Sequence, residues 1–140
     1  MKALIFVLSV LMASTAISQS EEYPFPDEDT EFPGGASEMK KFIATQIQYP
    51  EVAIRNGDQG RVYVSFVVGP DGQLSNIKID RGVTPELDAE AIRVVSSMPR
   101  WIPGKSNGEN IPVFCRLPII FTINVKTSRK ARREYRKRMK

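Results

Sequence analysis

The feature that most constrains the fold is a segment, residues 61–68, in which every second side chain is apolar. One face of this segment is made only of Val62, Val64, Phe66 and Val68. A period of two predicts a β-strand with one buried face. The next residues, Gly69-Pro70-Asp71-Gly72, have the composition of a tight turn. Residues 74–81 follow with Ile77 and Ile79 on one face, so the sequence predicts a β-hairpin.

Helices are predicted on both sides of this hairpin. Ser37 has the chemistry of a helix cap, and after it apolar residues recur at helical spacing, at Met39, Phe42, Ile43 and Ile47. Tyr49-Pro50 ends this helix, because the residue before a proline is pushed out of the helical region. Thr84-Pro85-Glu86 starts another helix with a capping hydroxyl, a proline and an acid. The apolar face of this helix, which we expect to be buried, is formed by Leu87, Ala91, Val94, Val95 and Met98.

The last strand region is residues 111–125, which Pro112 and Pro118 interrupt. Proline cannot donate a hydrogen bond to a ladder, so these positions need a bulge or an edge that faces solvent. Trp101, in the preceding loop of residues 101–108, is expected to anchor the core. The order helix, strand, strand, helix, strand predicts an α+β two-layer sandwich, with a three-stranded antiparallel sheet and helices packed on one face.

The chain begins with one lysine and an apolar run, residues 3–13, followed by the small residues Ala16 and Ser18. This pattern is typical of a signal peptide, residues 1–18, with cleavage after Ser18. The run is shorter than the ~20 residues that a spanning helix needs. We therefore expect an exported protein, with an uncleaved membrane anchor as the alternative.

Charge divides the rest of the chain into three parts. Residues 19–33 hold three prolines and six acids, which predicts a disordered acidic arm with a reach of at most ~50 Å. Residues 34–125 form the domain. Residues 126–140 carry nine Lys or Arg and one Glu, as a helix or an unstructured tail, and Ala131, Tyr135 and Met139 would give a helix a thin apolar edge. This basic tail is either a solvated charge run or a contact for an anionic surface such as lipid headgroups.

The sequence has no histidine, which removes the commonest general base and metal ligand. Asp88 and Glu90 are two residues apart on a predicted helix and do not share a face, which weakens an acid–base pair there. We predict no catalytic residues, no metal and no cofactor, and no nucleic acid as a partner. The single cysteine, Cys115, is expected to be buried as a small apolar residue, with an intermolecular or reactive thiol as the alternative.

Short segments spread along the domain form one ordered pattern. They are Phe32-Pro33-Gly34-Gly35, Tyr49-Pro50, Gly60-Arg61-Val62-Tyr63-Val64-Ser65-Phe66, Asp71-Gly72, Leu87-Asp88-Ala89-Glu90-Ala91 and Met98-Pro99-Arg100-Trp101-Ile102-Pro103-Gly104. In this order and spacing they resemble the TonB C-terminal domain family. The resemblance extends from Phe32 to about Val125.

This resemblance implies a non-enzymatic binding module in the periplasm, linked to energy-dependent outer-membrane transport. Its relatives bind the TonB box, a short segment at the N-terminus of outer-membrane transporters, as an added strand. The matching edge strand is Ile119-Ile120-Phe121-Thr122-Ile123-Asn124-Val125, and Gln46 and Gln48 match a second segment that touches the peptide.

Two alternatives remain. A full energy transducer of this type has an inner-membrane helix and a long proline-rich spacer, whereas the arm predicted here is short. The chain is then an anchored transducer only if its N-terminal segment is not cleaved. The other alternative is an envelope interaction protein that forms a homodimer through its edge strand and contacts a surface through its basic tail.

Overall fold

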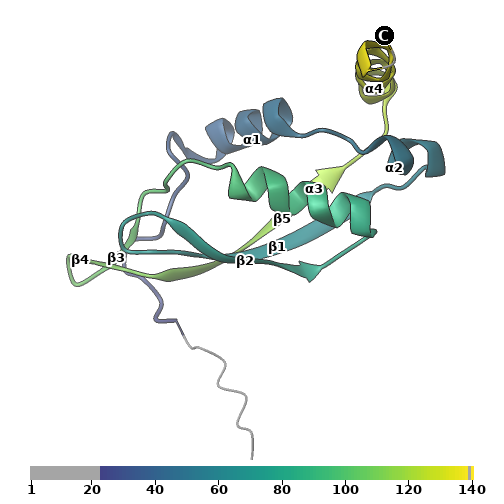
Figure 1. Ribbon diagram of the computed structural model, residues 1–140. Helices are drawn as coiled ribbons and strands as arrows, with labels where there is room; N and C mark the ends of the chain where they lie inside the picture. The colour runs from purple at the N-terminus through teal and green to yellow at the C-terminus, as the bar shows by residue number, and fades with distance from the viewer. Residues whose placement is uncertain (1–22, 139) are drawn as a thin grey trace, which may run out of the picture.

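The computed structural model describes residues 23–138 and 140, so the predicted signal peptide lies outside the described residues. Figure 1 shows the elements in space. In chain order they are α1 (Gly35–Gln46), α2 (Glu51–Asn56), β1 (Gly60–Val68), β2 (Leu74–Arg81), α3 (Pro85–Ser96), β3 (Gly104–Ser106), β4 (Glu109–Ile111), β5 (Val113–Phe121) and α4 (Val125–Arg138).

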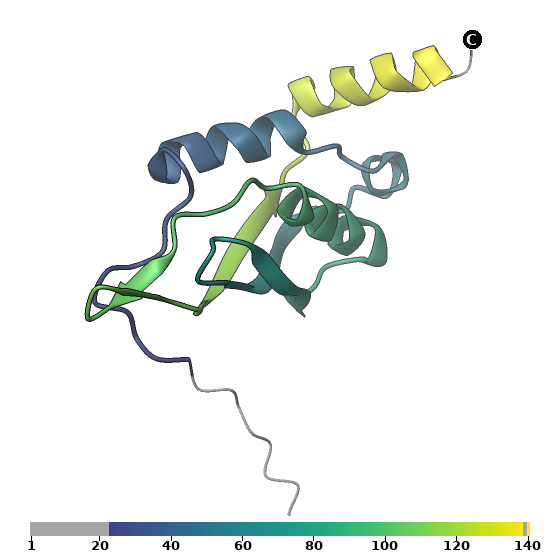
Figure 2. The same ribbon diagram turned by 60° about the vertical axis from the view of Figure 1, so that its left-hand side comes forward.

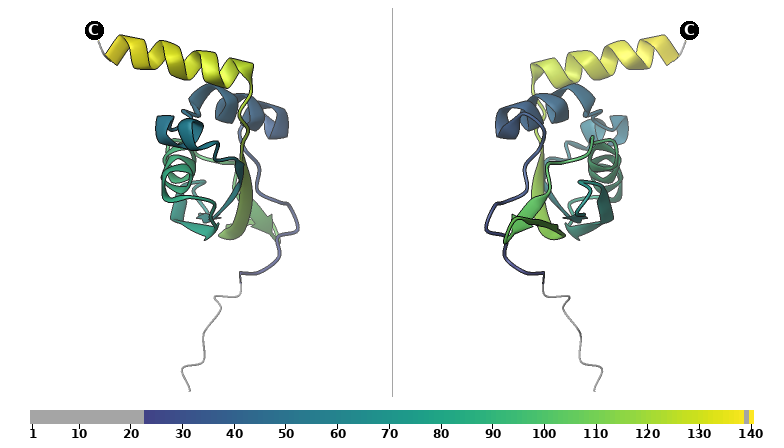
Figure 3. Two further views of the ribbon diagram at one scale, coloured as in Figure 1. Left: turned by 90° about the vertical axis from the view of Figure 1, so that its right-hand side faces the viewer. Right: turned by 90° about the vertical axis from the view of Figure 1, so that its left-hand side faces the viewer.

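A three-stranded antiparallel sheet with the order β2-β1-β5 forms the centre of the fold. β1 and β5 pair without interruption, from Gly60 opposite Phe121 to Val68 opposite Val113. β2 pairs with the other side of β1 through two register shifts. α3 lies against one face of the sheet, with α1 at the end of that layer (Figures 1 and 3). The predicted α+β class is therefore confirmed.

The core lies between this face of the sheet and α3. The four apolar residues of the predicted strand face inward and are at most 1% exposed: Val62, Val64, Phe66 and Val68. Trp101 joins this core as predicted. Its ring meets those of Phe66 and Phe32 edge-on, with centroids 5.4 and 5.8 Å apart. Burial of these large apolar surfaces is the main source of stability for the fold.

The starts of the two longer domain helices differ in how well the sequence predicts them. α3 begins as predicted, because the Thr84 side chain accepts a hydrogen bond of 3.3 Å from the Leu87 N–H and Pro85 is the first residue. α1 begins at Gly35, two residues before the predicted cap at Ser37, and no side chain caps it. The N-cap residue is Gly34, with a φ of 85°. A glycine adopts this angle without strain, and a serine does not.

The acidic arm is only in part what its composition predicts. Its described residues join the folded domain, which corrects the prediction of disorder for this stretch. Glu28 and Glu31 pair with Lys105 and Ile102 through backbone hydrogen bonds of 2.8–3.1 Å. Phe32 is 6% exposed and packs on the core. The acidic composition hides this attachment, because backbone pairing needs no particular side chains.

The predicted strand region of residues 111–125 is shorter and divided. β3 and β4 form a separate hairpin from the predicted loop, and its turn residues Asn107 and Gly108 both have positive φ angles. Pro112 separates β4 from β5, as a residue without an N–H does. Pro118 lies within β5 opposite Tyr63, on an edge strand. β5 ends at Phe121, so the last four residues of the predicted strand lie outside it.

The basic tail is a helix, α4, which is one of the two possibilities left open by the sequence. The predicted apolar edge of Ala131, Tyr135 and Met139 cannot be placed, since these side chains lie outside the described residues. Among residues 23–138 and 140, no helix is both long and apolar enough to cross a bilayer.

Cys115 is on the core-facing side of β5, opposite Phe66, and is partly buried. Burial raises the pKa of its thiol from 9.0 to about 11, with a smaller contribution from the charge of Asp29. Only the thiolate is a strong nucleophile. At pH 8 we expect iodoacetamide to alkylate the folded protein roughly a hundredfold more slowly than the urea-unfolded chain. Mass spectrometry measures both alkylation rates. Equal rates in the folded and unfolded states would show that the thiol is accessible and has ordinary reactivity.

Candidate functional site

β5 lies at an edge of the sheet and, among the described residues, its only strand partner is β1. On a strand, successive residues direct their backbone groups to opposite sides. Pro118 has no N–H, and a proline is tolerated where that missing donor would point away from the ladder. Phe114, Arg116 and Ile120 have the same parity, so their N–H and C=O groups point to the open edge.

The predicted edge segment of residues 119–125 is split by the fold. Only Ile119, Ile120 and Phe121 belong to β5. Thr122, Ile123 and Asn124 lead away from the strand, and Val125 begins α4. Apolar β-branched residues favour a strand wherever they occur, so the pattern alone does not reveal where pairing with β1 stops. That limit is set by β1, whose first residue, Gly60, pairs with Phe121.

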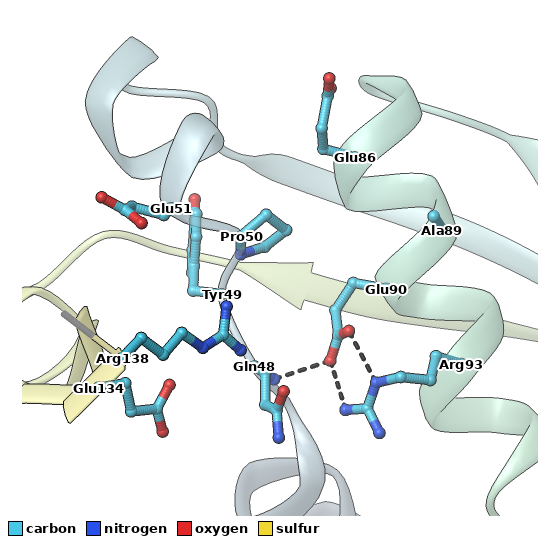
Figure 4. Close-up of a pocket in the computed structure, with 10 residues that line it drawn as sticks. All are labelled: Gln48, Tyr49, Pro50, Glu51, Glu86, Ala89, Glu90, Arg93, Glu134 and Arg138. Atoms are coloured by element: carbon cyan, nitrogen blue, oxygen red, sulfur yellow. Dashed lines mark hydrogen bonds and ion pairs between the residues drawn. The ribbon is translucent and has the colours of Figure 1, made fainter. Parts of the chain in front are cut away.

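The two predicted glutamines lie where α1 ends and leads into α2. Their side chains are exposed. Their backbones are held by α3, and Figure 4 shows this for Gln48. The Gln46 carbonyl accepts a hydrogen bond of 2.7 Å from Arg93, and the Gln48 N–H donates one of 2.8 Å to Glu90. Glu90 is 9% exposed and also binds the Arg93 guanidinium at 2.6 and 2.9 Å. The pair thus fixes the course of residues 46–48.

Tyr49 brings the two predicted parts of the site together. Its ring meets that of Phe121 edge-on, with centroids 5.6 Å apart, at the end of β5. Its hydroxyl donates a hydrogen bond to the Asp58 carbonyl, and burial raises the pKa of this hydroxyl, with the Asp58 charge as a smaller cause. The segment that holds Gln46 and Gln48 therefore lies beside the last residues of β5.

A cavity of about 330 Å³ opens next to this segment (Figure 4). It lies between the α1–α2 connection, α3 and the outer end of α4. Its lining residues are Gln48, Tyr49, Pro50, Glu51, Glu86, Ala89, Glu90, Arg93, Glu134 and Arg138. Four carboxylates and two guanidinium groups line it, which suits a polar peptide better than an apolar ligand.

The acids of α3 have structural roles. Asp88 accepts a hydrogen bond of 2.9 Å from the Val83 N–H, and Glu90 makes the contacts described above. In the described part of the chain, no group of three or more His, Cys, Asp or Glu side chains is placed to hold a metal ion.

Sequence reasoning missed the role of Glu90 and Arg93. One signal was present: Glu90 interrupts the apolar stripe of α3 between Leu87 and Val94, at positions that share a helix face. An acid on a buried face needs a partner, and Arg93 stands one turn away. The backbone groups of residues 46–48 that complete the arrangement come from the end of α1 and its connection to α2. No local pattern in the sequence reveals that these groups contact α3.

The fold and the site define a class: a small α+β interaction domain with an open edge strand. The chain matches the model of the Gram-negative bacterial TonB protein C-terminal over residues 45–123, more than half of its length. It therefore belongs to the TonB C-terminal domain family. This is a family of non-enzymatic interaction and transducer domains of the Gram-negative envelope, and membership links the chain to TonB-dependent outer-membrane transport.

Two solution structures of the Helicobacter pylori TonB C-terminal domain are similar to the chain, each at 25% sequence identity with a TM-score of 0.48. One match covers 61% of this chain and 90% of the other, and the second covers 66% and 87%. No curated protein matches the chain.

Proposed function

We propose that this domain works in the periplasm and binds the TonB box of outer-membrane transporters by strand addition to β5. The observation that supports this most directly is the regular edge of β5, which has no strand partner other than β1 among the described residues. An edge strand offers unpaired N–H and C=O groups, which bind an extended peptide through its main chain. Affinity of this kind makes loose demands on the peptide sequence, as a module that serves several transporters requires.

The opposite edge of the sheet is a poorer template. β2 has two register shifts against β1, and Asn76 has a φ of 52°. Such irregularities twist an edge and interrupt its row of backbone groups. β5 instead keeps nine consecutive pairs with β1, so its backbone is regular on both sides. Its one defect as a template is the donor missing at Pro118.

The segment around Gln46 and Gln48 supports the same proposal. It lies at the end of β5, its backbone is fixed by Glu90 and Arg93, and its glutamine side chains are exposed. A peptide that continues past Phe121 would therefore meet amide side chains on a rigid support, with the cavity beside them. Because a rigid segment loses little conformational entropy on binding, this arrangement favours affinity.

The test is a titration of isotope-labelled protein with N-terminal peptides of outer-membrane transporters from the same organism. We expect chemical-shift changes concentrated on β5 and on residues 46–49. A set of peptides, each N-methylated at one successive position, then tests the geometry. Methylation should weaken binding about tenfold or more at every second position and little at the positions between, because alternate amides face β5.

Variants of β5 provide the control. Replacement of Ile120 by proline removes an N–H that points to the open edge, and should abolish peptide binding. Ile120→Thr changes the same side chain but keeps the N–H, and should bind nearly as well as the wild type. Peptide-independent dimerisation in sedimentation experiments, with no effect of N-methylation, would contradict the proposal and favour a self-associating domain.

A further inference from the structure

α4 departs from the domain directly after β5. Three residues, Thr122 to Asn124, connect the two elements. Figures 2 and 3 show the helix extending past the body of the domain rather than lying across the sheet. All the described basic side chains of this part of the chain are exposed: Arg129, Lys130, Arg132, Arg133, Arg136, Lys137, Arg138 and Lys140.

The charges of α4 are arranged on two sides. On the side toward the domain, Lys130 donates a hydrogen bond of 3.4 Å to the Ile47 carbonyl, and Glu134 and Arg138 line the cavity shown in Figure 4. On the other side lies what we call the basic stripe. It is formed by Arg129, Arg132, Arg133, Arg136, Lys137 and Lys140, which line one shared hollow. Their spacing of three and four residues places them on one helical face.

The basic stripe is unfavourable for the isolated helix. Like charges three and four residues apart repel one another, and here no acid lies among them. A surface that serves only solubility intersperses charges of both signs. The only acid of α4, Glu134, lies on the side toward the domain, where it lines the cavity. An external polyanion that covers the stripe would remove this repulsion.

A group of acidic side chains and the basic stripe lie at opposite ends of the protein. Asp27, Glu28, Asp29 and Glu31 are exposed along the segment that pairs with the β3–β4 region. This acidic segment lies at the end of the molecule opposite α4 in every view (Figures 1, 2 and 3). A negatively charged surface therefore attracts one end of the protein and repels the other, so it orients the domain as well as binding it.

We propose that the basic stripe of α4 binds an anionic phospholipid surface. A planar surface engages all members of the stripe at once, and guanidinium groups, which form four of the six, bind phosphate oxygens through two parallel hydrogen bonds. Clusters of four to eight Lys or Arg on one helix have the charge that such surfaces attract. The inference is independent of the peptide that β5 binds.

Binding of this kind also places β5. The three connecting residues span at most ~10 Å, so a helix that lies on the bilayer keeps the end of β5 close to the headgroups. The acidic segment then points away from the membrane. The open edge would be presented where the segments of outer-membrane proteins emerge.

The test is co-sedimentation of the full chain with vesicles of phosphatidylcholine alone or mixed with phosphatidylglycerol. The charge-neutralised variant is R129Q/R132Q/R133Q/R136Q. A matched control, K40Q/R61Q/R81Q/R100Q, removes four exposed cations from the domain. Each Lys or Arg at such a surface contributes roughly a fivefold factor in binding, so we expect the stripe variant to bind anionic vesicles at least a hundredfold more weakly. The control should bind within a few-fold of the wild type.

Raising the salt concentration from about 0.05 to about 0.5 M should release the wild type, since screening shortens the range of these interactions. Vesicles without phosphatidylglycerol report any contribution of the apolar N-terminal residues. The proposal is overturned if both variants bind equally, if neutral vesicles bind as well as anionic ones, or if the stripe instead supports head-to-tail self-association seen by sedimentation. Heparin binding without vesicle binding would overturn it too.

Discussion

Replacement of Gly72 by alanine is expected to lower the free energy of unfolding by about 3 kcal/mol or more. Gly72 closes the β1–β2 turn with a φ of 82°, which a residue with a side chain adopts only under strain. Its carbonyl also accepts a hydrogen bond of 2.9 Å from the Trp101 N–H. A Cβ atom here would overlap the Trp101 carbonyl oxygen and would lie 3.2 Å from the carbonyl carbon.

The clash involves backbone on both sides, so no rotamer change relieves it. The turn and the Trp101 segment must separate, which breaks the hydrogen bond and loosens the packing of the indole ring on Phe66. Urea unfolding measures the effect. Gly108→Ala is the matched control, because Gly108 has a φ of 77° but nothing within 4 Å of the added atom. It should cost only the conformational strain of about 1 kcal/mol, and equal losses in the two variants would contradict the role of the close approach.

Replacement of Glu90 by alanine is expected to cost about 2–3 kcal/mol. It removes the acceptor of three hydrogen bonds, one from the Gln48 N–H and two from Arg93. Because 44% of the Arg93 side chain is exposed, water replaces part of what the guanidinium loses. The larger share of the cost falls on the Gln48 N–H, whose hydrogen bond is partly buried, and on the connection to residues 46–48. Chemical shifts of Gln46, Gln48 and Tyr49 should move in this variant.

Glu86→Ala is the control for this change. Glu86 lies one turn earlier on the same helix, is exposed and makes no ion pair with another described residue. Its loss should change stability by at most about 0.5 kcal/mol, through the helix dipole. If Glu90→Ala were equally mild and left the shifts of residues 46–49 in place, the segment would be held by packing of Tyr49 on Phe121 alone. A double-mutant cycle with Arg93→Ala then separates the two contributions.

The parts of the fold that sequence predicts well are those whose signal is local. The alternation of residues 61–68, the turn before Gly72 and the cap at Thr84 each depend on residues within a few positions of one another. Their physical causes, burial of one face, a positive φ and a satisfied N–H, act over the same short range. The predicted hairpin and the start of α3 therefore appear where the sequence places them.

Predictions failed where a distant segment decides the outcome. The strand region of residues 111–125 ends at Phe121 because its partner begins at Gly60. The acidic arm is attached because residues 102–105 offer it backbone groups and because Phe32 packs beside Trp101. Composition carries no information about either contact, since backbone hydrogen bonds do not depend on the side chains that it counts.

The candidate site also has one part that the sequence predicts and another that depends on distant segments. By itself, the sequence determined the α+β fold, the family and the approximate position of an edge strand. Hydrophobic periodicity and ordered motifs can be read along the chain without knowledge of the tertiary structure. Only the tertiary structure decided which residues form that edge, that Glu90 and Arg93 fix the connection beside it, and that the cations of α4 form one outward stripe. Each of these depends on groups far apart in the chain or on the direction in which a helix faces, and that direction is set by packing rather than by local preference.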